Sequence, residues 1–232
     1  MRVQEFGAGE PLLFVHGGPT SGAGFAPLVP HLEGVRCLVV DRPGSGLSET
    51  PAWTRSLLHH GLDHLVEDML DALGLERAHV LGSSFGGTFA LRAATATPER
   101  IARLVLLGGP SAIEGLPLPT MERLLLAPGM ARLASRFVPS RKGQRKAVQD
   151  IGHEAAVEDG RIPDVYWDWN DRLLQDTGAW RDDVGSLRFL AHWSMSYGPE
   201  ARITTDHLAR VQAPTLVVWG GHEPYGGRES AD

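Results

Sequence analysis

A serine set among glycines is the feature of this sequence with the clearest chemistry. The segment "HVLGSSFGGTFALRAA" contains the pattern G-x-S-x-G, with Ser84 at its centre and Gly82 and Gly86 at its ends. An apolar run precedes the pattern and a small-residue helical pattern follows it, so the serine falls at a strand-to-helix turn. Such a turn is strained and brings backbone against backbone, which requires small neighbours. We therefore predict that Ser84 is a nucleophile, raised above a sheet and beside the free N–H groups of a helix N-terminus.

The elements that must position this serine are short apolar runs, each ending in glycine or a turn. They are rich in Val and Leu without polar alternation, which is typical of strands buried on both faces. The five runs cover residues 11–18, 36–44, 78–84, 103–109 and 214–221. Stretches with helical spacing separate them, and the clearest covers residues 55–75. Alternating strands and helices predict a largely parallel sheet with helices on both faces.

The alternation stops after Gly109 and resumes once, at 215–219. The chain between is helical in pattern, broken by prolines, and shows no convincing strand. We therefore expect a core over residues 1–110, a helical lid over 111–212 and a continuation of the core over 213–232. Aromatic residues of the lid are either its own core or the lining of an apolar substrate pocket. They are Tyr166, Trp167, Trp169, Trp180, Trp193 and Tyr197.

Composition narrows the class of protein. The chain has 232 residues and a net charge of −6, which gives no reason to expect a nucleic acid or a membrane as partner. The basic stretch at 141–146 is expected to be a solvated loop or helix face. Cys37 is the single cysteine, and neither a metal-binding pattern nor a phosphate-binding G-x-G-x-x-G loop is present, so we expect no cofactor and no metal. The first residues do not resemble a signal peptide, so a cytoplasmic location is the default expectation.

Four motifs in sequence order resemble the α/β-hydrolase superfamily over nearly the whole chain. "HGGP" at 16–19 resembles the oxyanion loop, and "DRPGSGLS" at 41–48 resembles the turn after the next strand. "GSSFGG" resembles the nucleophile elbow, and "PTLVVWGGHEP" the strand that precedes the catalytic acid. The resemblance implies an α/β-hydrolase fold: a mostly parallel sheet with helices on both faces and a helical cap insertion. The serine argues against the branches that use aspartate, and "HGGP" is similar to prolyl aminopeptidases and to hydrolases of ring-cleavage products.

The resemblance also implies a role for each site residue. Ser84 would attack a carbonyl and form an acyl-enzyme, while the backbone N–H groups of Gly18 and Phe85 would stabilise the oxyanion. Glu223 matches the position of the acid, which is usually aspartate in this family, and Glu114 is the alternative. His16 matches a scaffold histidine of the oxyanion loop rather than the base.

The sequence has no histidine at the position where the resemblance places the catalytic base. The family's order is serine, acid, histidine, but no histidine follows His222. We therefore expect the C-terminal strand, the histidine loop and the closing helix to be missing from these residues, and the activity to be impaired. A non-catalytic binding protein on the same scaffold is the alternative to a hydrolase of a small-molecule ester, amide or activated C–C bond. Histidines elsewhere stay open as substitutes: His59, His60, His64, His153, His192, His207 and His222.

The same expectation concerns the edge of the sheet. Without a further strand, the run at 215–219 would leave backbone groups unpaired and an apolar face uncovered. This predicts self-association through the exposed sheet edge.

Overall fold

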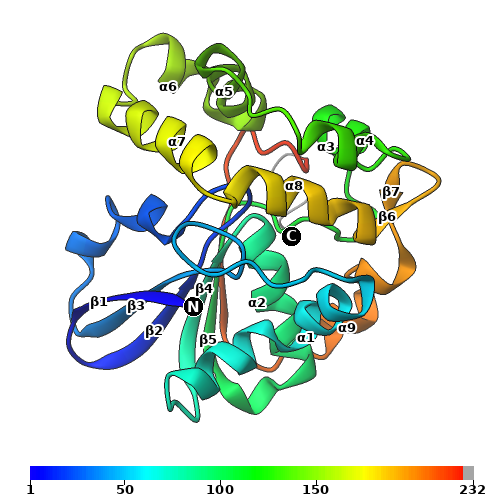
Figure 1. Cartoon of the computed structure of the whole chain (residues 1–232). Helices are drawn as coiled ribbons and strands as arrows, with labels where there is room; N and C mark the ends of the chain where they lie inside the picture. Colours follow the sequence, from blue (N-terminus) through cyan, green and yellow to red (C-terminus); the bar gives the residue numbers. More distant parts are fainter. Residues whose placement is uncertain (227–232) are drawn as a thin grey trace.

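A six-stranded sheet forms the centre of the molecule (Figure 1). The structure is a computed structural model and describes residues 1–226, so the last six residues of the predicted core continuation lie outside the described residues. The strand order is β1-β3-β2-β4-β5-β8; β1 pairs antiparallel with β3, and the other pairs are parallel. The strands are β1 (Arg2–Gly7), β2 (Glu10–Val15), β3 (Val35–Asp41), β4 (Ala78–Ser83), β5 (Ile101–Leu107) and β8 (Thr215–Val218). The five predicted strands are confirmed, and β1 was not predicted.

Alternate side chains of β2 enter two different apolar layers. Leu13 and Val15 pack with the buried face of the two long helices. Leu12 and Phe14 face the other side, where they pack with Phe25 and its neighbours from the 3-10 turns η1 (Gly22–Phe25) and η2 (Val29–His31). Burial on both faces explains why this strand lacks polar alternation.

Helices α1 (Arg55–Ala72) and α2 (Phe85–Ala96) cover one face of the sheet (Figure 1). The Thr54 side chain caps α1 by accepting a hydrogen bond from the Leu57 N–H, as expected of an N-cap threonine. The apolar stripe of α1 is buried, with Leu58, Leu62 and Val66 among its members. Gly74, with φ +67°, ends the helix in the left-handed conformation that glycine tolerates best. The helix predicted at 55–75 is therefore confirmed.

Most of the helical insertion between β5 and β8 lies above the carboxyl ends of the strands, and its last helix lies lower, against α2 (Figure 1). Its elements are α3 (Thr120–Leu125), α4 (Met130–Ala134), α5 (Arg141–Val148), the π-helical turn η4 (Gln149–His153), α6 (Glu154–Glu158), α7 (Asp164–Asp176), α8 (Ala179–Leu190) and α9 (Thr205–Ala209). The expectation that this region contains no strand is wrong in one detail. A small hairpin joins β6 (Ala191–His192) to β7 (Ser196–Tyr197), and strands of two residues are too short to leave a periodic signal.

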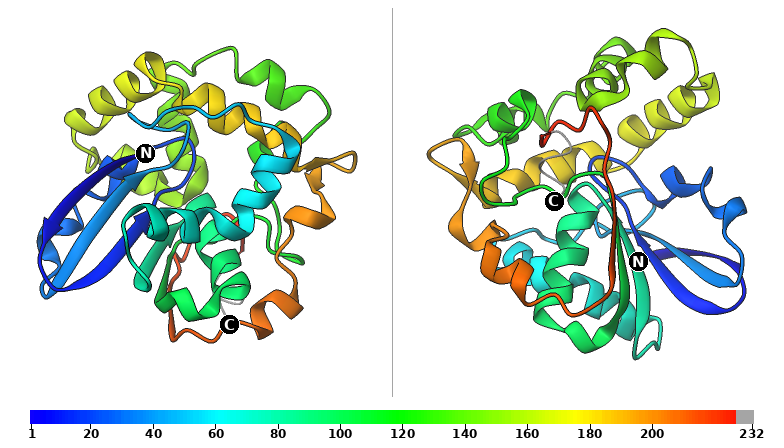
Figure 2. Two further views of the ribbon diagram at one scale, coloured as in Figure 1. Left: turned by 60° about the horizontal axis from the view of Figure 1, so that its bottom comes forward. Right: turned by 180° about the vertical axis from the view of Figure 1, so that it is seen from behind.

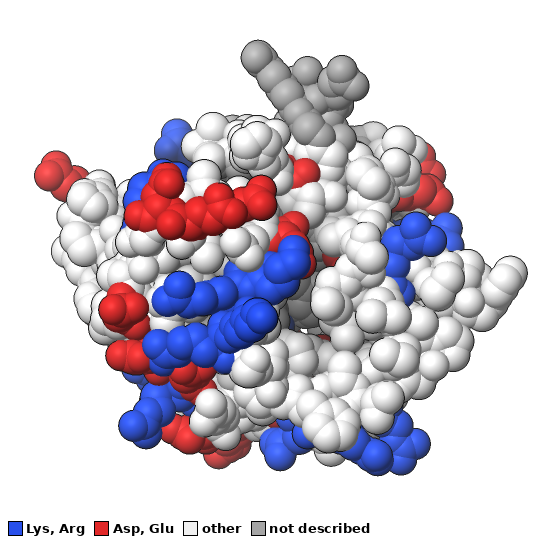
Figure 3. Space-filling model, turned by 90° about the horizontal axis from the view of Figure 1, so that it is seen from above, with Lys and Arg blue, Asp and Glu red and all other residues white. Residues whose placement is uncertain are grey.

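The basic stretch at 141–146 lies on helix α5, against the acidic face of α7. Arg141 forms ion pairs with Asp168 and Asp171, and Lys146 pairs with Asp150. Seen from the lid side, Lys and Arg side chains lie next to Asp and Glu side chains (Figure 3). The stretch is therefore a helix face with acidic partners, in line with its predicted assignment.

Strand β8 is the outer strand of the sheet and pairs with β5 alone among the described residues. Leu216 is 58% exposed and Val218 is 45% exposed. In the view from behind, β8 lies in front of the sheet and no drawn helix covers it (Figure 2, right). The predicted edge strand with an uncovered apolar face is confirmed within residues 1–226.

Candidate active site

Ser84 lies at the junction of β4 and α2, between the last strand residue, Ser83, and the first helical residue, Phe85. Its backbone has φ 49° and ψ −121°, a conformation that few residues other than glycine adopt. Strain of this kind persists only where the surroundings enforce it, and it is concentrated at functional sites. The strand-to-helix turn predicted around Ser84 is present.

The glycines beside Ser84 allow backbones to approach more closely than any side chain permits. A Cβ atom on Gly86 would lie 2.1 Å from the Val15 carbonyl oxygen and 2.5 Å from that of His16. A Cβ on Gly82 would lie 2.7 Å from the Gly86 carbonyl oxygen. These two positions bring α2 against the end of β4 and against the loop that follows β2. The glycines of the motif thus place Ser84 beside that loop.

The loop after β2 contacts the serine directly through Gly17. A Cβ atom on Gly17 would lie 3.6 Å from the Ser84 Oγ and 3.1 Å from its Cβ. His16, 1% exposed, precedes this contact. Its Nδ1–H donates to the Gly17 carbonyl at 2.7 Å, and its Nε2 accepts the Arg42 N–H at 2.9 Å. Burial, together with the charge of Arg42, holds the pKa of His16 well below its usual range. His16 is therefore a neutral scaffold residue, as the resemblance implied.

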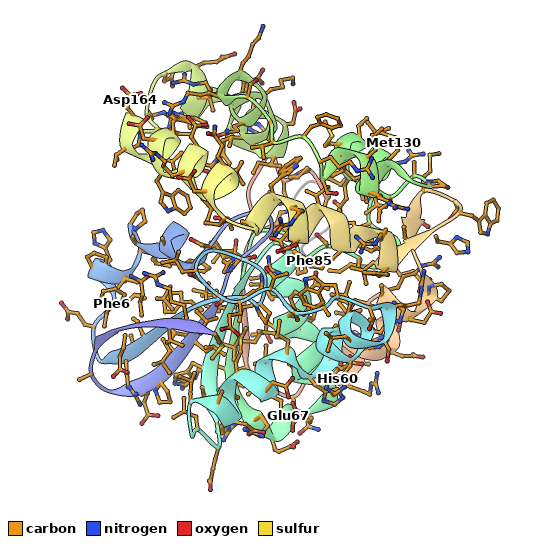
Figure 4. All side chains as sticks on the ribbon, viewed as in Figure 1. Phe6, His60, Glu67, Phe85, Met130 and Asp164 are labelled. Carbon is orange, nitrogen blue, oxygen red and sulfur yellow. The ribbon has the colours of Figure 1, made fainter. Side chains whose placement is uncertain are left out.

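The two predicted oxyanion donors belong to the two segments that meet at Ser84. Phe85 begins α2, and the N–H groups of a first helical turn have no acceptor within the helix. Gly18 follows the glycine that contacts the Ser84 hydroxyl. Figure 4 shows Phe85 where α2 begins, beneath helix α8. The roles of both N–H groups stay predictions, but the two segments that carry them do meet at the serine.

Glu223 lies at the same edge of the sheet as Ser84. Ser83 pairs with Leu107 and Leu107 with Val218, so the carboxyl ends of β4, β5 and β8 are neighbours. The Glu223 carboxylate accepts a hydrogen bond from the Gly109 N–H. Burial raises the pKa of Glu223, and this hydrogen bond and the nearby His153 oppose the rise. A partly buried carboxylate held by a strand terminus is in keeping with the predicted acid.

Glu114, the alternative acid, is differently placed. Its side chain is 53% exposed and its nearest cation is Arg202, at 3.4 Å. A solvated ion pair of this kind does little to orient a catalytic group. The geometry therefore favours Glu223.

The candidate histidines are spread over the molecule. His59 contacts the Phe189 carbonyl, His64 contacts Glu67, His192 contacts Ser194, and His207 caps α9 with Thr204. None of them forms a hydrogen bond with Ser84 within residues 1–226. Of the candidate histidines, His153 lies close enough to Glu223 for its charge to lower the pKa of that carboxyl. It lies there because η4 packs on the turn after β8. A Cβ on Gly152 there would lie 2.4 Å from the His222 carbonyl oxygen. Which histidine acts as the catalytic base stays open.

A partly buried carboxylate in the lid escaped the sequence analysis. Glu122 of α3 accepts hydrogen bonds from the hydroxyls of Tyr197 and Tyr225, and Tyr225 is also 2.7 Å from the Ser111 hydroxyl. Burial raises the pKa of Glu122, while these hydroxyls act in the opposite direction. The cluster joins the lid to the ends of β5 and β8. In sequence, Glu122 is one polar residue of a short helix and gives no signal of burial.

The lid aromatics divide between core and surface. Trp167 is 1% exposed, whereas Trp193 is 80% exposed at the tip of the β6–β7 hairpin. Trp180 donates its indole N–H to the Ala134 carbonyl within the lid. Trp167 therefore belongs to the core of the lid, which is one of the two roles predicted for these aromatic residues.

The surface has two hollows among the described residues that could hold a small molecule. A hollow of about 440 Å³ lies between Gly74 and Arg100, at the amino ends of β4 and β5 and so at the edge opposite Ser84. A second, of about 150 Å³, is lined mostly by apolar groups, including Trp53 and Phe89. The Phe89 ring stacks edge-on against Phe85, with centroids 4.9 Å apart. The second hollow therefore lies between α1 and the loop that follows β3, and among the aromatic residues of α2 it is Phe89 that lines it.

Within the described residues there is no group of three or more His, Cys, Asp or Glu side chains arranged to hold a metal ion. No helix among them is long and apolar enough to cross a membrane.

Comparison with known proteins agrees with this geometry. The model of the alpha/beta hydrolase fold family matches residues 10–231. The chain belongs to this family. The prediction of a hydrolase of α/β fold is thereby confirmed at the level of the family.

The curated relatives of this chain are hydrolases of small unsaturated oxo acids. A 2-hydroxy-6-oxononadienedioate/2-hydroxy-6-oxononatrienedioate hydrolase from Cupriavidus pinatubonensis is 31% identical over 95% of this chain and 73% of its own length. A 2-hydroxymuconate semialdehyde hydrolase from Pseudomonas sp. strain CF600 is 34% identical over 68% of this chain and 58% of its own. Among solved structures, the meta-cleavage product hydrolase CumD from Pseudomonas fluorescens IP01 has a TM-score of 0.73 at 19% identity, covering 99% of this chain and 79% of its own. That likeness shows the shared fold.

Proposed function

We propose that this hydrolase cleaves an ester, amide or activated C–C bond of a mid-sized apolar substrate through an acyl-enzyme at Ser84. The observation that supports this most is the strained backbone of Ser84, with φ 49°, against the Gly17 backbone. A hydroxyl held there can attack a carbonyl, and the N–H groups of Gly18 and Phe85 are the donors for the oxyanion. Glu223 is proposed as the acid of the site.

The names of the relatives favour the C–C bond of a small dienoate derived from an aromatic ring. Ser84 Oγ would lose its proton and add to the keto or aldehyde carbonyl, and the C–C bond would then break, leaving its electron pair on the conjugated fragment. That fragment takes a proton, and water releases the acyl group as a carboxylic acid. The proposal includes a core at 1–110 and 213–232 and a lid at 111–212.

A second candidate function is a non-catalytic or weakly active binding protein on the same scaffold. It is favoured by the absence, within residues 1–226, of any hydrogen bond between Ser84 and a histidine. Loss of the base lowers turnover by orders of magnitude but leaves the contributions of binding and the oxyanion hole. The two candidates therefore differ in rate, not in the identity of the site.

Turnover in matched serine variants separates these candidates. We would measure hydrolysis of 2-hydroxymuconate semialdehyde and of p-nitrophenyl butyrate by the protein and by its Ser83→Ala and Ser84→Ala variants. The proposal predicts activity that survives Ser83→Ala, is lost in Ser84→Ala, and favours the dienoate. No turnover of either compound above the Ser84→Ala background would favour the binding protein instead.

Self-association through β8 is proposed from the exposed Leu216 and Val218 side chains. Size-exclusion chromatography of a Leu216→Glu variant tests it, with Leu208→Glu on helix α9 (41% exposed) as the matched control. The Leu216→Glu variant is expected to elute later than the parent and the control. Equal elution of all three would contradict the proposal.

A further inference from the structure

Arg42 lies behind the oxyanion loop with its side chain only 4% exposed. Its Nε donates to the His16 carbonyl at 2.9 Å, and its Nη2 donates to the Gly17 carbonyl at the same distance. One buried cation therefore holds two successive carbonyl oxygens of the loop that contacts Ser84. Its guanidinium also lies 5.6 Å from the ring centres of Phe85 and Phe89, which fixes it from the side of α2.

The hydrogen bond from Arg42 to the Gly17 carbonyl also fixes the orientation of the Gly18 N–H. The peptide between Gly17 and Gly18 is trans, and in a trans peptide the carbonyl and the following N–H point in opposite directions. Because Arg42 binds the Gly17 oxygen, the Gly18 N–H must point away from Arg42. This N–H is the proposed oxyanion donor, and no side chain on either glycine restricts the rotation of that peptide.

The lid supplies the countercharge. Asp183, in the second turn of α8, accepts a hydrogen bond from the Arg42 Nη2 at 2.8 Å and one from the Ser45 hydroxyl at 3.4 Å. The same Asp183 oxygen lies 3.1 Å from the point where a Cβ on Gly18 would be. Arg42 and Asp183 are separated by 141 residues in sequence, so their contact exists only when α8 is seated on the core.

We propose that Arg42 is a positioning residue for the oxyanion hole and that Asp183 makes this positioning depend on the seating of helix α8. The proposal rests on the proposed function of Ser84 and adds a role for two residues that the motifs did not single out. The lid then does more than cover the site, because one of its carboxylates orients the cation that sets the Gly17–Gly18 peptide.

The neighbouring residue on the same helix provides a matched control. Asp182 also ties α8 to the core, but it accepts a hydrogen bond from the Thr50 hydroxyl at 2.6 Å and makes none with Arg42. Asp182→Asn removes a carboxylate charge at the neighbouring position of α8 while its amide oxygen can still accept from the Thr50 hydroxyl. Asp183→Asn removes the carboxylate that faces Arg42.

A double variant separates positioning from stability. Replacing a buried ion pair by apolar residues of similar size often leaves stability unchanged or raises it, whereas removing one partner leaves a buried charge alone. We therefore expect the Arg42→Met/Asp183→Leu variant to melt near the parent's temperature and yet to turn over ester more slowly. A purely structural pair would leave its kcat at the parent value.

The measurements are kcat and KM for p-nitrophenyl butyrate, together with the melting temperature, for all variants. We expect kcat to fall at least tenfold, with KM changed less than threefold, in Asp183→Asn and in the double variant, and less than twofold in Asp182→Asn. Equal kcat losses in Asp182→Asn and Asp183→Asn, or parent kcat in the double variant, would overturn the proposal.

A crystal structure of the double variant keeps this test independent of the proposed function. If the parent shows no turnover, the proposed function fails, but the orientation of the Gly17–Gly18 peptide still decides the role of Arg42. The proposal predicts that this peptide is rotated or occupies several orientations in the double variant. An unchanged peptide there would overturn it.

Discussion

The change Gly86→Ala tests how the elbow is built. An alanine Cβ would lie 2.1 Å from the Val15 carbonyl oxygen, whereas ordinary contacts begin at 3.4 Å, so helix or strand must move by more than an ångström. Overpacking a rigid site costs about 1–3 kcal/mol or more, and the gain in helix propensity offsets about 0.5–1 kcal/mol. We expect a net loss of about 2 kcal/mol in the free energy of unfolding, because both partners are backbone.

Urea unfolding measures this loss against a matched control. Gly61 is the same residue type inside α1 and has no atom within 4 Å of its added Cβ. Gly61→Ala is therefore expected to stabilise the protein by about 0.5–1 kcal/mol through helix propensity alone. For an m-value of about 3 kcal/mol/M, Gly86→Ala would lower the urea midpoint by about 0.7 M. If both variants raised the midpoint, the close packing inferred at the elbow would be refuted.

Two further predictions concern pH. Because the pKa of His16 is held well below that of the unfolded chain, the unfolded state binds more protons, and stability falls as pH drops below about 6.5. In His16→Asn, the loss of unfolding free energy between pH 7 and pH 5 should be smaller by up to about 2 kcal/mol; an unchanged loss would show that His16 titrates normally. The raised pKa of Glu122 has the opposite sign, since the folded state keeps a proton that the unfolded state has lost. Glu122→Gln should therefore gain stability relative to the parent as pH rises above about 4.5, measured by thermal melts, and a gap that stays constant with pH would contradict this.

The features predicted correctly from sequence depend on neighbours along the chain. Strands β2 to β5 are covered on both faces of the sheet, so most of their side chains must be apolar. The elbow at Ser84 is set by glycines within two positions of it.

The features missed depend on contacts between distant parts of the chain. Strand β1 is half exposed and mixes polar with apolar residues, so it lacks a clear period. The partly buried Glu122 accepts hydrogen bonds from hydroxyls 75 and 103 residues away in the sequence. The contact between Arg42 and Asp183 likewise has no local signature. Sequence patterns indicated the candidate nucleophile Ser84 but not the lid residues that pack near it.

Labelling by a fluorophosphonate tests the central claim most directly, because the probe reacts with an activated serine hydroxyl and requires no particular substrate. The account predicts that mass spectrometry finds the label on Ser84, that Ser83→Ala is labelled like the parent, and that Ser84→Ala is not labelled. Label on another residue, equal labelling of Ser84→Ala, or no label on the parent would contradict it.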